Sequence, residues 1–156
     1  MRQKQILGVG RLTHQKGFDI LISAFAASQA PARGWTLTII GDGDARAELQ
    51  AMAQRLGVDH LLHMPGVSSD PWQYMNDASI YVLASRFEGF PNALLEAMAM
   101  GCAVIATDCP SGPAEIVKTQ TNGLMIEADN PRALQQALDV LIDQPERRTQ
   151  LAVMGL

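Results

Sequence analysis

Short apolar runs alternate with stretches of helical periodicity along the whole 156-residue chain. The apolar runs predict six strands, at residues 5–9, 35–40, 61–64, 79–83, 103–107 and 123–126. Apolar residues spaced three and four apart predict helices at 18–28, 44–56, 70–76, 91–100, 113–117 and 130–142, with another from 146. Asp44 is expected to cap the second helix, and Pro71, Pro91 and Pro131 stand at or near expected helix starts.

Strands that alternate with helices indicate right-handed βαβ units and an α/β fold. We therefore expect a Rossmann-like, doubly wound parallel sheet of six strands in the order 3-2-1-4-5-6, with helices on both faces. In such a sheet a ligand binds beyond the carboxyl ends of the strands where the order reverses. Here that point lies between the first and fourth strands, so the loops at 10–17 and 85–91 are the candidate binding loops.

Composition and charge exclude several classes of protein. Twelve basic and 16 acidic residues give a net charge of −4, which argues against a general nucleic-acid binder. Residues 1–18 carry four basic residues and no acid, so they hold +4 and the remainder holds −8. Such a basic segment favours a small anionic ligand, although chance clustering explains it equally well. Two cysteines indicate a reducing, cytoplasmic location, and no apolar run approaches the ~18 residues of a membrane span.

The first candidate loop, Gly8-Val9-Gly10-Arg11-Leu12-Thr13-His14-Gln15-Lys16-Gly17, begins like a dinucleotide fingerprint. Thr13 stands where that fingerprint needs its third glycine, so the match fails. Gly8 and Gly10 still permit close approach of backbone to a phosphate. Arg11 can donate to two phosphate oxygens and Lys16 supplies a mobile positive charge. The alternative is a solvated loop with two ordinary basic residues.

The second candidate loop leads into a helix without a capping side chain. With Pro91 expected at the first helical position, Phe90 takes the N-cap and has no oxygen to accept a hydrogen bond. The N–H groups of Asn92, Ala93 and Leu94 are then free, and a free helix N-terminus at this place favours a phosphate.

Two glutamates accompany this helix start. Glu96 lies one turn after Asn92 on the same face, from which it could reach a pair of hydroxyl groups beyond the phosphate. Glu88 follows the fourth strand and is expected to face the same crevice. The alternative is an ordinary amphipathic helix whose Glu96 faces water.

At these residues the sequence resembles the C-terminal, nucleotide-sugar-binding domain of the family-four retaining glycosyltransferases of GT-B fold. Four segments carry the resemblance, in order: Gly8-Val9-Gly10-Arg11 with Lys16-Gly17; Gly41-Asp42-Gly43; Glu88 and Glu96 with seven residues between them; and Gly112-Pro113-Ala114-Glu115-Ile116. The segment Ser111-Gly112-Pro113 departs from the Gly-Gly pair of many members. We associate that variant with polysaccharide and lipopolysaccharide enzymes.

The resemblance implies a role for each matching residue. Arg11 and Lys16 would hold the donor diphosphate, Glu96 would bind the ribose hydroxyls, and Glu88 would meet the donor sugar or the reacting face. Arg11, Lys16 and Glu88 form the implied catalytic set. The cations Arg11 and Lys16 would stabilise the transition state where the leaving diphosphate gains negative charge. The implied donor-binding residues are Gly10, Arg11, Lys16, Gly66, Val67, Glu88, Gly89, Phe90, Pro91, Asn92, Ala93, Leu94 and Glu96, with Met64 to Val67 lying along the base.

Asp42-Gly43-Asp44 forms a DxD pattern, which holds a divalent metal in the other large glycosyltransferase fold. Here its glycines suit a turn and Asp44 suits a helix cap. We therefore expect no metal and no other cofactor.

The resemblance further implies that residues 1–156 form a single domain of a larger two-domain enzyme. A nucleoside-diphosphate sugar, with a UDP-sugar favoured over a GDP-sugar, would donate a hexose or N-acetylhexosamine with retention of configuration. The acceptor, a polysaccharide or a lipopolysaccharide or glycolipid precursor, would bind an N-terminal domain absent from this chain. That full-length protein would act in the cytoplasm, peripherally at the inner face of the membrane, and the isolated domain would be inactive. A nucleotide-sugar epimerase of the same fold and a non-catalytic nucleotide-sugar-binding module remain open as alternatives.

Overall fold

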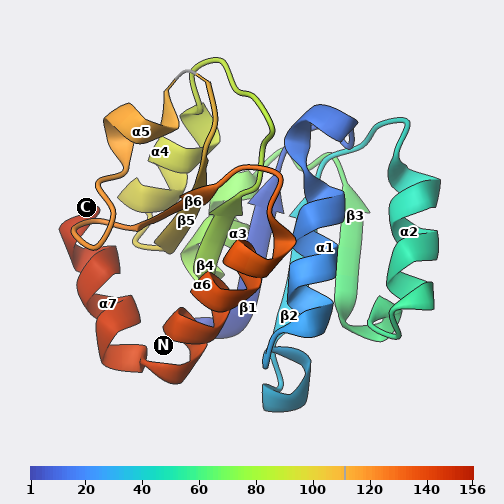
Figure 1. The fold of residues 1–156 in the computed structure, drawn as a ribbon, viewed down its shortest axis with the longest axis horizontal. Coiled ribbons are helices and arrows are strands. Elements are labelled where there is room, and N and C mark those ends of the chain that lie inside the picture. The colour runs from blue at the N-terminus through green and yellow to red at the C-terminus, as the bar shows by residue number, and fades with distance from the viewer. Residues whose placement is uncertain (111) are drawn as a thin grey trace.

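A parallel six-stranded sheet forms the centre of the protein (Figure 1). The computed structural model describes residues 1–110 and 112–156. The strands are β1 (Gln3–Val9), β2 (Thr36–Ile40), β3 (Leu62–Gly66), β4 (Ala78–Leu83), β5 (Ala103–Asp108) and β6 (Leu124–Glu127). Their order, β3-β2-β1-β4-β5-β6, confirms the predicted topology. The arrowheads of β1 and β3 point to the top of Figure 1, so the carboxyl edge of the sheet lies there.

Helices cover both faces of the sheet, as predicted. They are α1 (Phe18–Ala27), α2 (Arg46–Arg55), α3 (Pro71–Asp77), α4 (Asn92–Ala99), α5 (Pro113–Ile116), α6 (Pro131–Asp143) and α7 (Pro145–Met154), with short 3-10 turns η1 (His14–Lys16), η2 (Pro31–Arg33) and η3 (Asp59–Leu61). Helices α1, α2, α6 and α7 share one apolar core with the sheet, and α3 and α4 share a second core on its other face. Within the described part of the chain, no helix is long and apolar enough to cross a membrane.

The start of α2 corrects one sequence-based expectation. Asp44 does not cap this helix: Ala45 occupies the N-cap position, and no side chain bonds to it there. The reason is a contact with Leu12, in the loop after β1. The Leu12 N–H donates to the Asp42 carbonyl, and the Leu12 carbonyl accepts the N–H of Ala45. These two bonds determine the path of the backbone through Asp44, and the helix begins only at Arg46.

Arg2 joins α3 and α4 at their carboxyl ends. Its guanidinium donates to the carbonyls of Met75 at 2.8 Å and Ala78 at 2.7 Å, and also to the carbonyl of Met100, which ends α4. A positive charge at the end of a helix is favoured by the helix dipole. Gly101 has a φ of 88°, and a Cβ there would lie 2.6 Å from the Arg2 guanidinium. Glycine at 101 therefore leaves room for this contact.

Arg86 joins the two loops that leave β1 and β4. Its guanidinium donates to both carboxylate oxygens of Asp19, at 3.0 and 2.8 Å, and to the carbonyl of His14 at 2.6 Å. Its backbone N–H donates to the carbonyl of Gln15, and its side chain also meets Asp129 at 3.2 Å. Burial alone would raise the pKa of Asp19, but the hydrogen bonds and charge of Arg86 outweigh it and hold that pKa below its ordinary value.

Replacing Arg2 is expected to destabilise the packing of α3 and α4 and to lower the melting temperature. Arg2→Ala removes the charged donor from several partly buried carbonyls, which should cost about 2 kcal/mol of the free energy of unfolding. For a domain of this size the melting temperature should fall by about 4–8 °C. Thermal unfolding measures the change, with Lys4→Ala as the control. Lys4 is exposed, and among the described residues its ammonium donates only to the Arg33 carbonyl. Equal melting temperatures for the two variants would contradict this role of Arg2.

The Arg86–Asp19 pair predicts a pH-dependent stability. Because the folded-state pKa of Asp19 is lowered, the ionised carboxylate stabilises the fold fully above its unfolded-state pKa of about 3.9. This stabilisation is lost as the pH falls through the folded-state pKa. Asp19→Asn should lower the melting temperature at pH 7 by about 2–4 °C, since a partly screened charged pair contributes about 1 kcal/mol. That difference should shrink towards zero below about pH 4. Asp44→Asn, at an exposed position, should show no such pH-dependent difference.

Candidate functional site

The candidate site lies at the carboxyl edge of the sheet, where the strand order reverses between β1 and β4. These two strands pair directly, through Ile6 with Ile80 and Leu7 with Tyr81. The loops that follow them therefore leave the sheet side by side, which confirms the predicted location of the two candidate loops. Glycine at Gly17 helps them to approach, because a Cβ there would collide with the carbonyl of Ala84.

Lys16 and Glu88 meet across these two loops. The Lys16 Nζ lies 3.0 Å from Oε1 and 3.1 Å from Oε2 of Glu88, and the Ser85 hydroxyl donates to Oε2 at 2.7 Å. The Glu88 side chain is only 8% exposed, and its three hydrogen bonds hold it in place. A Cβ at Gly10 would lie 3.2 Å from Lys16 Cδ, so glycine lets the lysine stem pass over the end of β1. The sequence placed both residues at the crevice but did not predict that they pair.

The start of α4 differs from the sequence-based expectation. Pro91, not Phe90, occupies the N-cap, and the helix begins at Asn92. The N–H of Asn92 donates to the Phe90 carbonyl at 3.0 Å, and that of Leu94 donates to the Pro91 carbonyl at 3.1 Å. Of the three N–H groups expected to be free, only that of Ala93 has no partner among the described residues. The predicted absence of a capping side chain is confirmed for the part of the chain that the structure describes.

The loop after β5 presses against the same helix start. Gly112 has a φ of 87°, and a Cβ there would lie 2.9 Å from the Gly89 carbonyl and 2.7 Å from Pro91 Cδ. Phe90, between them, is 63% exposed at the rim of the site, whereas Pro91 is buried. Ser111, part of the variant noted in the sequence, lies outside the described residues.

Glu96 has a partner that the sequence did not predict. The indole Nε1–H of Trp72, on α3, donates to Glu96 Oε2 at 3.0 Å. The Trp72 side chain is 52% exposed. No local pattern could indicate the contact, because the two residues belong to separate helices.

A pocket of about 270 Å³ lies beside these residues, between the turns that follow β1, β2 and β3. Gly10, Arg11 and Val67 are among its lining residues. Gly66 precedes Val67 at the end of β3, and its carbonyl accepts the N–H of Gly41 at 2.9 Å. Arg11 is exposed and forms no ion pair within the described residues, so its charge is available to a ligand.

The DxD segment is engaged in local contacts. The Asp42 carboxylate accepts hydrogen bonds from Arg46 Nε at 2.9 Å and from the N–H of Gly43 at 2.8 Å, and these lower the pKa of Asp42. No group of three or more potential metal-binding side chains occurs among the residues described. The expectation that no metal is needed stays a prediction.

Together these features form a crevice that holds cationic donors and carboxylate acceptors. Lys16 supplies an ammonium with three N–H donors and Arg11 a guanidinium. The start of α4 supplies the Ala93 N–H, which has no partner among the described residues, and the positive end of a helix dipole. Glu96, one turn further along α4, supplies an acceptor for hydroxyl groups. A ligand with an anionic centre flanked by hydroxyls matches this arrangement.

Comparison with known proteins identifies relatives with this architecture. A relative from Campylobacter jejuni subsp. jejuni serotype O:2, N-acetylgalactosamine-N,N'-diacetylbacillosaminyl-diphospho-undecaprenol 4-alpha-N-acetylgalactosaminyltransferase, is 34% identical over 148 residues, which cover 95% of this chain and 40% of the relative. A lipopolysaccharide 1,6-galactosyltransferase of Salmonella typhimurium is 41% identical over 123 residues, or 75% of this chain and 33% of the relative. The chain thus spans less than half of either curated relative.

A solved structure matches over a larger share of its own length. The C-terminal domain of a glycosyl transferase group 1 family protein, LpcC from Francisella tularensis, has a TM-score of 0.87 and 30% identity, covering 99% of this chain and 84% of that one. The model of the family described as "Glycosyl transferases group 1" matches residues 1–154. The chain therefore belongs to the glycosyl transferases group 1 family, with one Rossmann-like half of the GT-B fold.

Proposed function

We propose that this chain is the nucleotide-sugar-binding domain of a retaining glycosyltransferase, and that it binds a UDP-sugar in preference to a GDP-sugar. The observations that carry the proposal are the Lys16–Glu88 pair at the point where the strand order reverses, and the start of α4 and Glu96 in the segment that follows Glu88. Parallel α/β sheets bind their ligands at this point. A nucleoside diphosphate combines the anionic centre and the hydroxyl pair for which these groups provide partners.

The diphosphate is proposed to lie between Lys16, Arg11 and the Ala93 N–H. Glu88 already accepts from the Lys16 ammonium, but a three-donor group keeps capacity for a phosphate oxygen. The Arg11 guanidinium can donate to two phosphate oxygens at once. The nucleobase would then enter the 270 Å³ pocket beside Val67, and the ribose would lie against Glu96.

The proposed chemistry relies on charge stabilisation. When the glycosidic bond breaks, the nucleoside diphosphate leaves with increased negative charge. Arg11, Lys16 and the helix start stabilise that charge where it develops, and such preorganised groups commonly contribute the largest catalytic effect. Glu88, fixed by Lys16 and Ser85, would meet the donor sugar near the reacting carbon. The proposed outcome is retention of configuration at that carbon.

The acceptor is proposed to bind a further domain of a longer protein. The resemblance to the excised C-terminal domain from Francisella tularensis supports this division. The named relatives act on lipopolysaccharide and on a diphospho-undecaprenol-linked saccharide, which favours a saccharide or lipid-linked acceptor at the inner face of the membrane. Two buried free thiols, Cys102 and Cys109, are compatible with a reducing cytoplasm. The chain by itself is proposed to bind the donor without transferring the sugar.

Removing the Glu96 carboxylate is expected to weaken UDP binding selectively. Hydrogen bonds to a charged acceptor contribute about 1.5–3 kcal/mol, so Glu96→Ala should raise the dissociation constant of UDP about tenfold or more. The loss should be smaller for 2′-deoxy-UDP, which lacks one of the hydroxyls, giving a positive coupling energy in a double-mutant cycle. Calorimetry with both nucleotides, and with GDP for comparison, measures these changes.

Glu48→Ala is the matched control, because Glu48 is exposed on α2. It should change neither affinity. Equal losses for UDP and 2′-deoxy-UDP in Glu96→Ala would show that this carboxylate does not contact the ribose. If the wild-type chain binds no nucleoside diphosphate at all, the proposed function is wrong.

UDP binding is expected to be independent of divalent metal. Cationic side chains and the α4 start neutralise the diphosphate, and Asp42 of the DxD segment is paired with Arg46. Calorimetric titrations with excess chelator and with added magnesium or manganese should give the same dissociation constant within error. A loss of affinity in chelator that manganese restores would place the Asp42 and Asp44 carboxylates in the site.

A further inference from the structure

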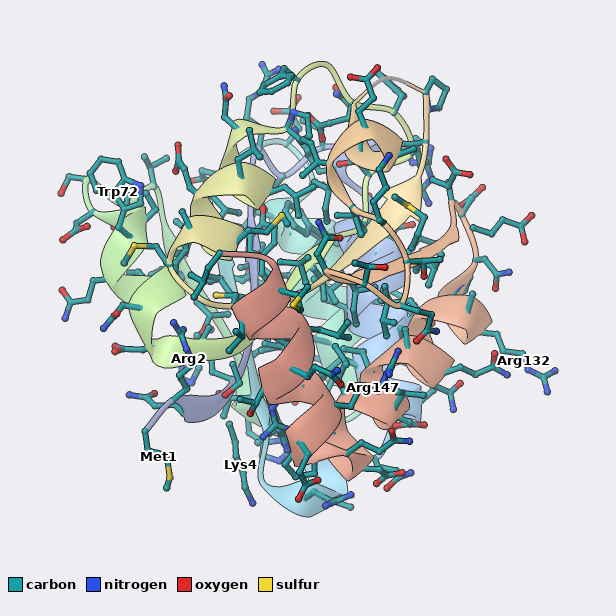
Figure 2. All side chains as sticks on the ribbon, turned by 90° about the vertical axis from the view of Figure 1, so that its left-hand side faces the viewer. Met1, Arg2, Lys4, Trp72, Arg132 and Arg147 are labelled. Carbon is teal, nitrogen blue, oxygen red and sulfur yellow. The ribbon has the colours of Figure 1, made fainter. Side chains whose placement is uncertain are left out.

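A tryptophan outside the implied donor-binding set contacts the glutamate proposed to bind the ribose. Trp72 occupies the first turn of α3 and donates its indole N–H to Glu96 Oε2 at 3.0 Å. Figure 2 shows Trp72 at the upper end of α3, with Arg2 near the opposite end of the same helix. The indole N–H is the only hydrogen-bonding group on this side chain, and Glu96 receives it.

Burial does not account for the placement of Trp72. The side chain is 52% exposed, so it gains only part of the hydrophobic stabilisation that a buried tryptophan provides. Trp35, the other tryptophan, is 2% exposed and packs in the core on the opposite face of the sheet. Trp72 instead presents its single donor to a carboxylate at the rim of the site.

Both residues are fixed by the elements that carry them. Met75 of α3 is fully buried in the same apolar core as Leu94 of α4. Arg2 joins the carboxyl ends of these two helices, and the Trp72–Glu96 hydrogen bond joins the amino end of α3 to the middle of α4. The two helices are therefore connected at two places, and the indole N–H is held at a defined place beside Glu96.

This contact leaves acceptor capacity for a ligand. A carboxylate has two oxygens and about four lone-pair sites, of which the indole occupies one. Oε1 and the remaining site of Oε2 can accept from a pair of hydroxyl groups. A free glutamate side chain loses rotamer entropy when a ligand immobilises it. A glutamate already held by Trp72 has lost part of that freedom before binding.

We propose that Trp72 is a positioning residue, which holds the Glu96 carboxylate in the orientation that accepts the ribose hydroxyls of the donor nucleotide. The inference rests on the proposed function and extends it to a residue on a neighbouring helix. Trp72 acts through Glu96, so its effect on affinity depends on the presence of that carboxylate and of the ribose 2′-hydroxyl.

The contact itself is tested without ligand. The chain contains two tryptophans, so a ¹H–¹⁵N spectrum should show two indole resonances, and Trp72→Phe identifies the one that belongs to Trp72. Glu96→Ala should shift this resonance and leave that of Trp35 unchanged. If the Trp72 resonance does not respond to Glu96→Ala, the two side chains are not in contact and the inference is wrong.

The positioning role is tested by UDP binding to Trp72→Phe, which keeps an aromatic ring and removes the N–H donor. Its UDP dissociation constant should rise about three- to tenfold, as expected for one lost hydrogen bond. The change should be smaller for 2′-deoxy-UDP and absent when Trp72→Phe is added to Glu96→Ala. A residue that only supports the fold would lower both nucleotide affinities equally and would act regardless of Glu96.

Gln73→Ala is the matched control, because Gln73 is the exposed neighbour of Trp72 on α3. It should alter neither the melting temperature nor UDP affinity. If Glu96→Ala loses more affinity for UDP than for 2′-deoxy-UDP while Trp72→Phe behaves like Gln73→Ala, only the positioning role of Trp72 is wrong. If the wild-type chain binds no UDP while the indole resonance still responds to Glu96→Ala, the proposed function is wrong and the positioning role is overturned with it.

Discussion

The site depends on the parallel pairing of β1 with β4. At this pairing the strand order reverses. The two strands come from segments about 70 residues apart, and the loops that follow them leave the sheet at the same edge. Arg86, in the loop after β4, donates hydrogen bonds to Asp19 and to the His14 carbonyl, and so links this loop to the segment after β1. This cross-link holds the turn η1, which carries Lys16, beside the loop that carries Glu88.

The Lys16–Glu88 pair keeps the Lys16 ammonium ordered at the candidate site. An unpaired ammonium that is partly removed from water is unfavourable, and the largely buried carboxylate of Glu88 offsets that cost. The ammonium nevertheless retains a donor, and Arg11 remains exposed nearby at the pocket. One cation is therefore held in place and the other is exposed, and the proposed diphosphate ligand would use both.

The sequence was sufficient for features that depend on periodicity and chain order. Alternating apolar runs predicted all six strands, and the order was predicted from the doubly wound arrangement that six alternating strands and helices favour. The contacts that orient the site were harder to predict, because they join distant residues. The pairing of Trp72 with Glu96 leaves no periodic signal, and the caps at Asp44 and Phe90 were misplaced because contacts between loops and short turns, not side-chain propensity, determine where those helices begin.

The turns after β1 and β2 approach each other closely. Gly41 has a φ of 141°, and a Cβ there would collide with the carbonyl of Gly10, so another residue at 41 would displace one of the two turns. Both glycines line the pocket, together with the exposed Arg11 and Val67. A substitution at 41 would therefore change the pocket by moving backbone, whereas a substitution at 67 would change only the lining. Under the proposed function, the preference for a nucleobase is expected to diverge through exposed lining positions of this kind, while the strands beneath stay the same.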